Sequence, residues 1–146
     1  MPHLLQIVRG FRLDGPGRLV LSLLRAWRPE EVRVSLVALS RKGALRGEIE
    51  REIERLGGTV HVMFTGWPDI PRTARRIAEL ARREGVTHMH GHLLRPDLTA
   101  RMAAHRAGVP YVVTEHGVHA WQEKGIHLRP LVRQWYLRSL APGDLV

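Results

Sequence analysis

Four histidines stand in two short segments of the chain where they could act together on a ligand. His88, His90 and His92 alternate with other residues, and His116 follows a second apolar segment. An imidazole can hydrogen-bond a substrate hydroxyl, stabilise a developing charge or bind a metal ion. Side chains of an extended segment repeat every two residues, so His90 and His92 are predicted to project on the same side. His92 is nearer the end of its segment and is predicted to face a ligand, whereas His90 fits a buried, hydrogen-bonded histidine equally well.

The second group of candidates surrounds His116. The preceding segment 109–113 ("VPYVV") is rich in β-branched and aromatic residues, which favours a packed strand, and Glu115, His116 and Gly117 follow it. Glu115 could accept a hydrogen bond from a substrate hydroxyl or pair with one of the many arginines. His116 could act on a ligand or only cap the loop, and both interpretations remain open at this point.

A glycine-rich stretch near the amino terminus offers a different chemistry. Gly15 and Gly17 belong to the sequence "DGPGR", which is predicted to lie in a loop before a helix. Glycine lets the backbone approach a ligand closely, and the N–H groups at the start of a helix favour phosphate. Such a stretch is also typical of a simple turn, so it indicates a phosphate site only if other candidate residues lie near it.

The elements that would position these residues alternate along the chain. Predicted strands cover 3–8, 31–40, 59–64, part of 85–94 and 109–113. Predicted helices cover 19–27, 43–58, a segment that starts at Pro71, 98–108 with Asp97 as its N-cap, and 127–140. This alternation predicts an α/β fold, with a Rossmann-like open parallel sheet and helices on both faces.

A parallel sheet of this kind gives the candidate residues a common location. Ligands bind beyond the carboxyl ends of the strands, at the point where the strand order reverses. The loops after the first, fourth and fifth predicted strands contain the glycine pair, the alternating histidines and Glu115 to Gly117. We therefore expect these three loops to meet at one edge of the sheet.

Composition limits the classes of partner. The chain has 146 residues and no cysteine, which is the length of one domain and excludes disulfides and thiolate metal sites. The 23 Lys and Arg against 14 Asp and Glu give a net charge of +9, whereas aromatic residues make up only 5%. Nucleic-acid binding is not expected, because basic residues are not interleaved with stacking aromatics. The remaining anionic partners are phosphorylated molecules or a membrane surface, the latter by way of the basic amphipathic segment 127–140. The charge is explained equally well by a general preference for arginine, with no anionic partner.

Three motifs together resemble a known family. The stretches "DGPGR", "THMHGH" and "GVPYVVTEHG" resemble the N-terminal domain of retaining glycosyltransferases of family 4, whose GT-B fold has two facing Rossmann-like domains. The resemblance covers essentially the whole chain, and the third motif is its most specific part. Pro16 splits the glycine pair, Arg18 replaces a small residue, and Thr87 replaces an Asp. These departures concern the glycine loop and leave the match to the fold intact.

The resemblance implies a function and a set of site residues. It implies a nucleotide-sugar donor, a glycan or lipid-linked acceptor, and a cytoplasmic protein, with a peripheral position at the inner face of the membrane as an alternative. His116 would be the catalytic residue facing the transferred sugar. The substrate-binding residues would be Gly15, Gly17, His90, His92, Glu115 and Gly117. No cofactor and no metal are expected.

The family's second domain, which binds most of the donor through a Glu-x7-Glu motif, has no counterpart here. Glu115 and Glu123 have that spacing, but in the wrong domain, so we attribute it to chance. We expect residues 1–146 to form a single acceptor-side domain, inactive alone, that needs a second GT-B domain in cis or in trans.

Two alternatives stay open. His88, His90 and His92 could bind zinc with His116 and His119, although no carboxylate-rich loops follow them. The chain could also be a free-standing Rossmann-type module that binds a phosphate or nucleotide through Gly15 and Gly17.

Overall fold

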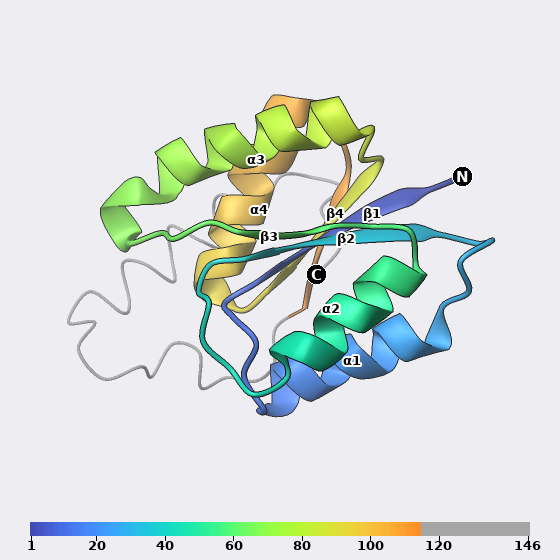
Figure 1. Cartoon of the computed structure of the whole chain (residues 1–146). Helices are drawn as coiled ribbons and strands as arrows, with labels where there is room; N and C mark the ends of the chain where they lie inside the picture. Colours follow the sequence, from blue (N-terminus) through green and yellow to red (C-terminus); the bar gives the residue numbers. More distant parts are fainter. Residues whose placement is uncertain (115–146) are drawn as a thin grey trace.

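The computed structural model describes residues 1–114, in which strands and helices alternate around one parallel sheet (Figure 1). The strands are β1 (His3–Val8), β2 (Arg33–Ala38), β3 (Val60–Val62), β4 (His88–His92) and β5 (Tyr111–Thr114). The helices are α1 (Gly15–Ala26), α2 (Arg46–Arg55), α3 (Ile70–Glu84) and α4 (Leu94–Ala107), with a short 3-10 helix η1 (Trp67–Asp69) before α3. The strand order is β3-β2-β1-β4-β5, and all neighbours are parallel. The predicted Rossmann-like α/β fold is confirmed.

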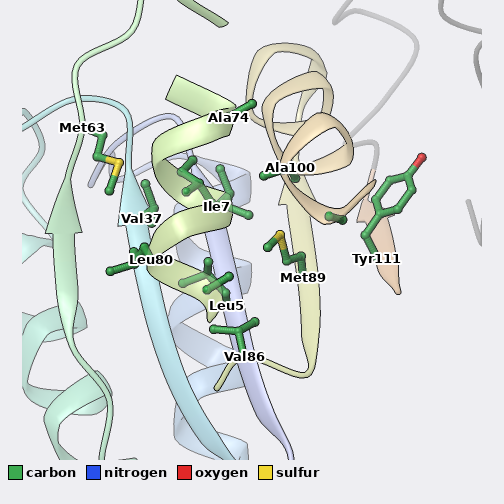
Figure 2. Close-up of a cluster of buried hydrophobic side chains, with 14 of the residues drawn as sticks. Leu5, Ile7, Val37, Met63, Ala74, Leu80, Val86, Met89, Ala100 and Tyr111 are labelled. Carbon is green, nitrogen blue, oxygen red and sulfur yellow. The ribbon is translucent and has the colours of Figure 1, made fainter. Parts of the chain in front are cut away.

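Helices cover both faces of the sheet. In Figure 1, α1 and α2 lie on one face, and α3 and α4 lie on the other. Figure 2 shows the core under α3 and α4, where Leu5 and Ile7 of β1 meet Met89 of β4. On the opposite face, Val8 and Leu36 pack against α1 and α2. Each large apolar side chain buried in this way contributes about 1.5–3 kcal/mol to folding.

Helix α3 shows how the sequence pattern produces this packing. Pro71 lies in its first turn, where a missing N–H costs nothing, and Gly85 ends it in the left-handed region at φ 68°. Its apolar residues face the sheet, among them Ala74 and Ile77, which are fully buried. The predicted solvated face is also confirmed, because these arginines are exposed: Arg72, Arg75, Arg76, Arg82 and Arg83.

Two helices begin earlier than the sequence predicts. Helix α1 begins at Gly15 rather than near residue 19, because Asp14 caps its first turn. Helix α4 begins at Leu94 rather than after Asp97, and Asp97 N–H already donates to the Leu93 carbonyl at 2.8 Å. Pro96 is compatible with this start, since the first-turn N–H groups of a helix have no intrahelical partner. Asp97 is therefore a fully buried residue of the first turn and not the N-cap.

Some predictions fall on residues that the structure does not describe. Glu115, His116, Gly117 and the predicted helix 127–140 lie outside the described residues. Among residues 1–114, no helix is both long and apolar enough to cross a bilayer.

Candidate active site at the carboxyl edge of the sheet

The strand order reverses between β1 and β4. Strands β2 and β3 lie on one side of β1, and the chain then returns so that β4 and β5 lie on the other side. The loops that leave β1 and β4 therefore diverge to opposite faces of the sheet, toward α1 and α4. This divergence opens space at the carboxyl ends of the two strands, which is where open α/β sheets bind ligands.

The loop after β1 is fixed by the cap of α1. Asp14 Oδ1 accepts a hydrogen bond of 3.0 Å from the Gly17 N–H. A Cβ on Gly17 would lie 1.9 Å from the carbonyl oxygen of Arg12, so the packing of the loop on itself requires a glycine here. Gly15 differs, because it is exposed and no atom would lie within 4 Å of a Cβ added to it. The two glycines thus lie in the first helical turn, and Gly15 is the one with open space around it.

The alternating histidines lie on one face of β4, as predicted. His90 and His92 have ring centroids 4.0 Å apart. Register pairs His90 with Gln6 of β1, and the Gln6 Oε1 atom lies 2.7 Å from His92 Nε2. With that oxygen as the acceptor, Nε2 is the protonated nitrogen of His92. His90 Nε2 lies 2.7 Å from the Thr114 hydroxyl on β5.

These contacts make a polar strip across three strands. His92 is 1% exposed and Gln6 is fully buried, whereas His90 is partly exposed. The Gln6 Nε2 atom is buried and has no hydrogen-bond partner within residues 1–114. Under α1 and α2 the same face of the sheet is apolar, so its character changes between β1 and β4. A polar strip that begins at the reversal of strand order fits a binding site better than a packing surface.

Backbone strain marks the turn from β4 into α4. Leu93 has φ 71° and ψ 164°, a backbone conformation that residues other than glycine rarely adopt. Gly91, two residues earlier, allows α4 to pack closely against β4, since a Cβ there would lie 2.8 Å from the Asp97 Cα atom. Strain of this kind costs about 1–3 kcal/mol and is found mainly at functional sites. The sequence carries no signal for it, because leucine is not a residue type that indicates positive φ.

A small pocket brings two of the predicted residues together. Its volume is about 20 Å³, and its lining includes Gly17, His92 and Leu93. Arg9 and Arg12 also line it, and neither was singled out from the sequence, because the arginines are spread along the chain. Arg12 forms an exposed ion pair of 3.3 Å with Asp14. Gly15 and His90 do not line the pocket, so the structure joins only part of the predicted set.

The alternative zinc site is not formed by the residues that the structure describes. Within residues 1–114, no three His, Asp or Glu side chains are arranged to hold a metal ion. His88 is exposed and its Nδ1 atom lies 2.9 Å from the Thr87 hydroxyl. Glu115, His116 and Gly117 lie outside the described residues, so their roles stay predictions.

A separate polar cluster lies at the opposite, amino edge of the sheet. His3 Nε2 lies 2.9 Å from the Ser35 hydroxyl, and its Nδ1 lies 3.1 Å from the Glu84 carbonyl oxygen. Burial lowers the pKa of His3, against the raising effect of the hydrogen bond to the Glu84 backbone. Ser35 is fully buried, so this serine–histidine contact cannot reach a substrate. The Glu84 carboxylate continues the cluster to His61 at 2.9 Å, which ties α3 to β3. We interpret the cluster as structural.

A solved structure is similar to part of this chain. The chain is similar to the C-terminal domain of a hydrogenase from Pyrococcus furiosus, with 16% identity, a TM-score of 0.49, and coverage of 77% of this chain and 90% of that chain. A similarity at this level carries no argument about the fold or the activity of this chain. No curated protein matches the chain.

Comparison with protein families is more informative. The model of Glycosyltransferase Family 4 matches residues 13–146. The matched region includes Gly15, Gly17 and β4 with its histidines, whereas Gln6, Arg9 and Arg12 precede it. The chain therefore belongs to glycosyltransferase family 4.

Proposed function

We propose that this chain is the acceptor-side domain of a retaining GT-B glycosyltransferase that moves a sugar from a nucleotide-sugar donor to a glycan or lipid-linked acceptor. Membership of the family supports sugar transfer in general. The observation that carries the more specific proposal is the polar strip of Gln6, His90 and His92 at the reversal of strand order. His90 is the partly exposed member of the strip and can contact a sugar hydroxyl, whereas the buried Gln6 and His92 hold the strip in place.

The reaction makes defined demands on such a site. The bond between the anomeric carbon and the diphosphate oxygen breaks, and the nucleoside diphosphate leaves with both electrons of that bond. An acceptor hydroxyl oxygen forms the new bond to the anomeric carbon and loses its proton to the departing phosphate. The enzyme must hold the two substrates in this geometry and stabilise the charge that develops on the sugar.

We assign the residues of this chain to the following parts of the proposed site. His92, held by Gln6, positions the polar strip beside the small pocket. Gly15 leaves the amino end of α1 open to a phosphate, whereas the Gly17 N–H already bonds Asp14. His116 would donate a hydrogen bond to the transferred sugar. His90, Glu115 and Gly117 would contact substrate hydroxyls.

The proposal also includes a second domain. Turnover in a GT-B enzyme needs a facing domain that completes the donor site, so residues 1–146 alone should bind substrate without turning it over. A second domain could be supplied in cis or in trans. Attachment to the inner face of an anionic membrane through 127–140 stays part of the proposal, and no helix within residues 1–114 could span that membrane.

The test compares glycines in equivalent helical positions. Gly15 and Gly47 both lie in the first turn of a helix, in α1 and α2, and neither has an atom closer than 3.8 Å to an added Cβ. Isothermal titration with a panel of nucleotide sugars should show binding that Gly15→Ala weakens and Gly47→Ala leaves unchanged.

Sugar transfer is then measured with this chain joined to a donor-binding domain of the same family. Transfer of the sugar from a nucleotide sugar to an acceptor supports the proposal. Binding of free nucleotides with no preference for their sugar esters, together with no transfer, would instead indicate a free-standing nucleotide-binding module.

A further inference from the structure

A second, larger depression adjoins the candidate active site, and we call it the basic pocket. Its volume is about 330 Å³. Its walls come from the loops after β1, β2 and β3 and from the first turn of α4. The lining residues on which the argument depends are Arg9, Arg12, Ser40, Lys42, Phe64 and Arg95.

The lining has a strongly one-sided charge. Arg9, Arg12, Lys42 and Arg95 all contribute cations, and none of the described residues that line the pocket is acidic. The nearby carboxylate of Asp14 forms an ion pair with Arg12. Cations gathered in a concave site raise the local positive potential and attract anions. Guanidinium groups also match the geometry of phosphate oxygens.

One of these cations is held in place by the fold. Arg95 Nη1 donates a hydrogen bond of 3.1 Å to the Thr65 carbonyl oxygen, which ties α4 to the segment after β3. Its Nε atom is buried and has no partner within residues 1–114. Holding a guanidinium before a ligand arrives lowers the entropy cost of binding.

The facing wall is rigid as well. Phe11 N–H donates to the Lys42 carbonyl at 3.0 Å, and Leu45 N–H donates to the Phe11 carbonyl at 3.1 Å. Gly43 allows this contact, because its φ is 141° and a Cβ there would lie 1.8 Å from the Phe11 carbonyl oxygen. The loops after β1 and β2 are thus joined by backbone hydrogen bonds, which sets the position of Lys42 on the rim.

An aromatic ring completes the pocket. Phe64 is 63% exposed, which is unusual for a side chain of its size. The Arg41 guanidinium lies 5.6 Å from its ring centroid, in the range of a cation–π contact. The ring therefore offers an apolar surface beside a group of cations, and this combination fits a small ring compound that carries a phosphate.

We propose that the basic pocket binds a phosphate ester of the acceptor substrate. Binding of the phosphate follows from the pocket alone, whereas its assignment to the acceptor rests on the proposed glycosyltransferase function. The basic pocket shares Arg9, Gly10 and Arg12 with the small pocket next to His92. A molecule anchored by its phosphate in the basic pocket can therefore present a hydroxyl to the candidate active site.

The first experiment measures protection of Lys42 in the 146-residue chain. Lys42 and Lys124 are the lysines of the sequence, so an amine-acylating reagent followed by peptide mass spectrometry reports on each separately. Glucose 6-phosphate should slow the acylation of Lys42 relative to Lys124, whereas glucose and added chloride at equal ionic strength should not. Equal protection by chloride would overturn the proposal.

Variants test whether the side chains of the basic pocket supply the affinity for glucose 6-phosphate. In isothermal titration, Lys42→Gln and Arg95→Gln should each weaken the binding of glucose 6-phosphate by about tenfold, the effect of losing one charge-assisted hydrogen bond. Arg28→Gln is the matched control, because Arg28 is exposed and follows α1 at the opposite edge of the sheet. Thermal unfolding of each variant verifies folding. Equal weakening by Arg28→Gln would show that only net charge matters and would overturn the proposal.

Two further comparisons distinguish a lipid phosphate from a soluble phosphate ester, and the pocket proposal from the glycosyltransferase proposal. Protection of Lys42 by vesicles of phosphatidylcholine with phosphatidylglycerol is compared with protection by glucose 6-phosphate. Stronger protection by the vesicles identifies a lipid headgroup, and stronger protection by glucose 6-phosphate identifies a soluble ester. Neither measurement uses a donor or turnover. Phosphate binding without sugar transfer would therefore contradict only the glycosyltransferase proposal, and transfer to neutral acceptors without phosphate binding would contradict only the pocket.

Discussion

Gln6 and His92 join β1 to β4 by a buried hydrogen bond of 2.7 Å at the place where the strand order of the sheet reverses. The two residues are 86 positions apart in the sequence. Both side chains are almost completely buried, so neither can exchange this partner for water without local unfolding. The bond therefore fixes one side of the candidate site to the central strand of the sheet.

The first prediction concerns this bond. Gln6→Leu should lower the free energy of unfolding by about 1–3 kcal/mol, because His92 keeps a buried polar nitrogen without its partner. The measurement is urea unfolding followed by circular dichroism. The double variant Gln6→Leu/His92→Leu should recover most of the loss, since it removes both polar groups. Additive losses in the double variant would contradict a direct interaction between the two residues.

The second prediction separates the two glycines of α1. Gly17→Ala should prevent normal folding or lower stability strongly, because the new Cβ would lie 1.9 Å from the Arg12 carbonyl oxygen. Gly15→Ala and the control Gly47→Ala should each change the free energy of unfolding by less than about 1 kcal/mol, the upper value for alanine in the middle of a helix. Urea unfolding of the three variants tests this. A stable Gly17→Ala protein would show that the loop after β1 is not packed as described.

The third prediction concerns the buried histidine at the amino edge. Burial lowers the pKa of His3 in the folded chain, so the unfolded chain takes up a proton first as the pH falls. The free energy of unfolding should therefore decrease as the pH drops from about 6.5, the ordinary histidine pKa, to the lower pKa of the folded state. Urea unfolding at several pH values measures this dependence. His3→Gln should flatten the profile, whereas His105→Gln, at an exposed position on α4, should not.

The fourth prediction tests the catalytic role assigned to His116. In the chain joined to a donor-binding domain, His116→Ala should lower turnover by about 10²–10³-fold, the scale of losing one transition-state hydrogen-bond donor. Its melting temperature should remain that of the unchanged protein. A variant that melts early and keeps its turnover would support a structural cap instead.

The fold class could be predicted from the pattern of residues alone. Alternating strand and helix patterns are local properties, because each depends on how a short segment divides apolar from polar residues. The residues of β1 were predicted without error, and the side shared by His90 and His92 followed from the two-residue repeat of a strand. The three motifs also identified the family that the family comparison then showed.

Contacts between distant segments determine which residues meet. Gln6 is the one amide in an apolar strand, yet nothing local indicates that its partner is His92. The start of α1 at Gly15 depends on a cap by Asp14, and the positive φ of Leu93 occurs at the turn into α4, which packs closely against Gly91. The basic pocket combines three loops and a helix, so its cations appear in the sequence only as scattered arginines and one lysine. Such features depend on contacts between distant segments, whose positions are set by the packing of the whole sheet rather than by any short stretch of sequence.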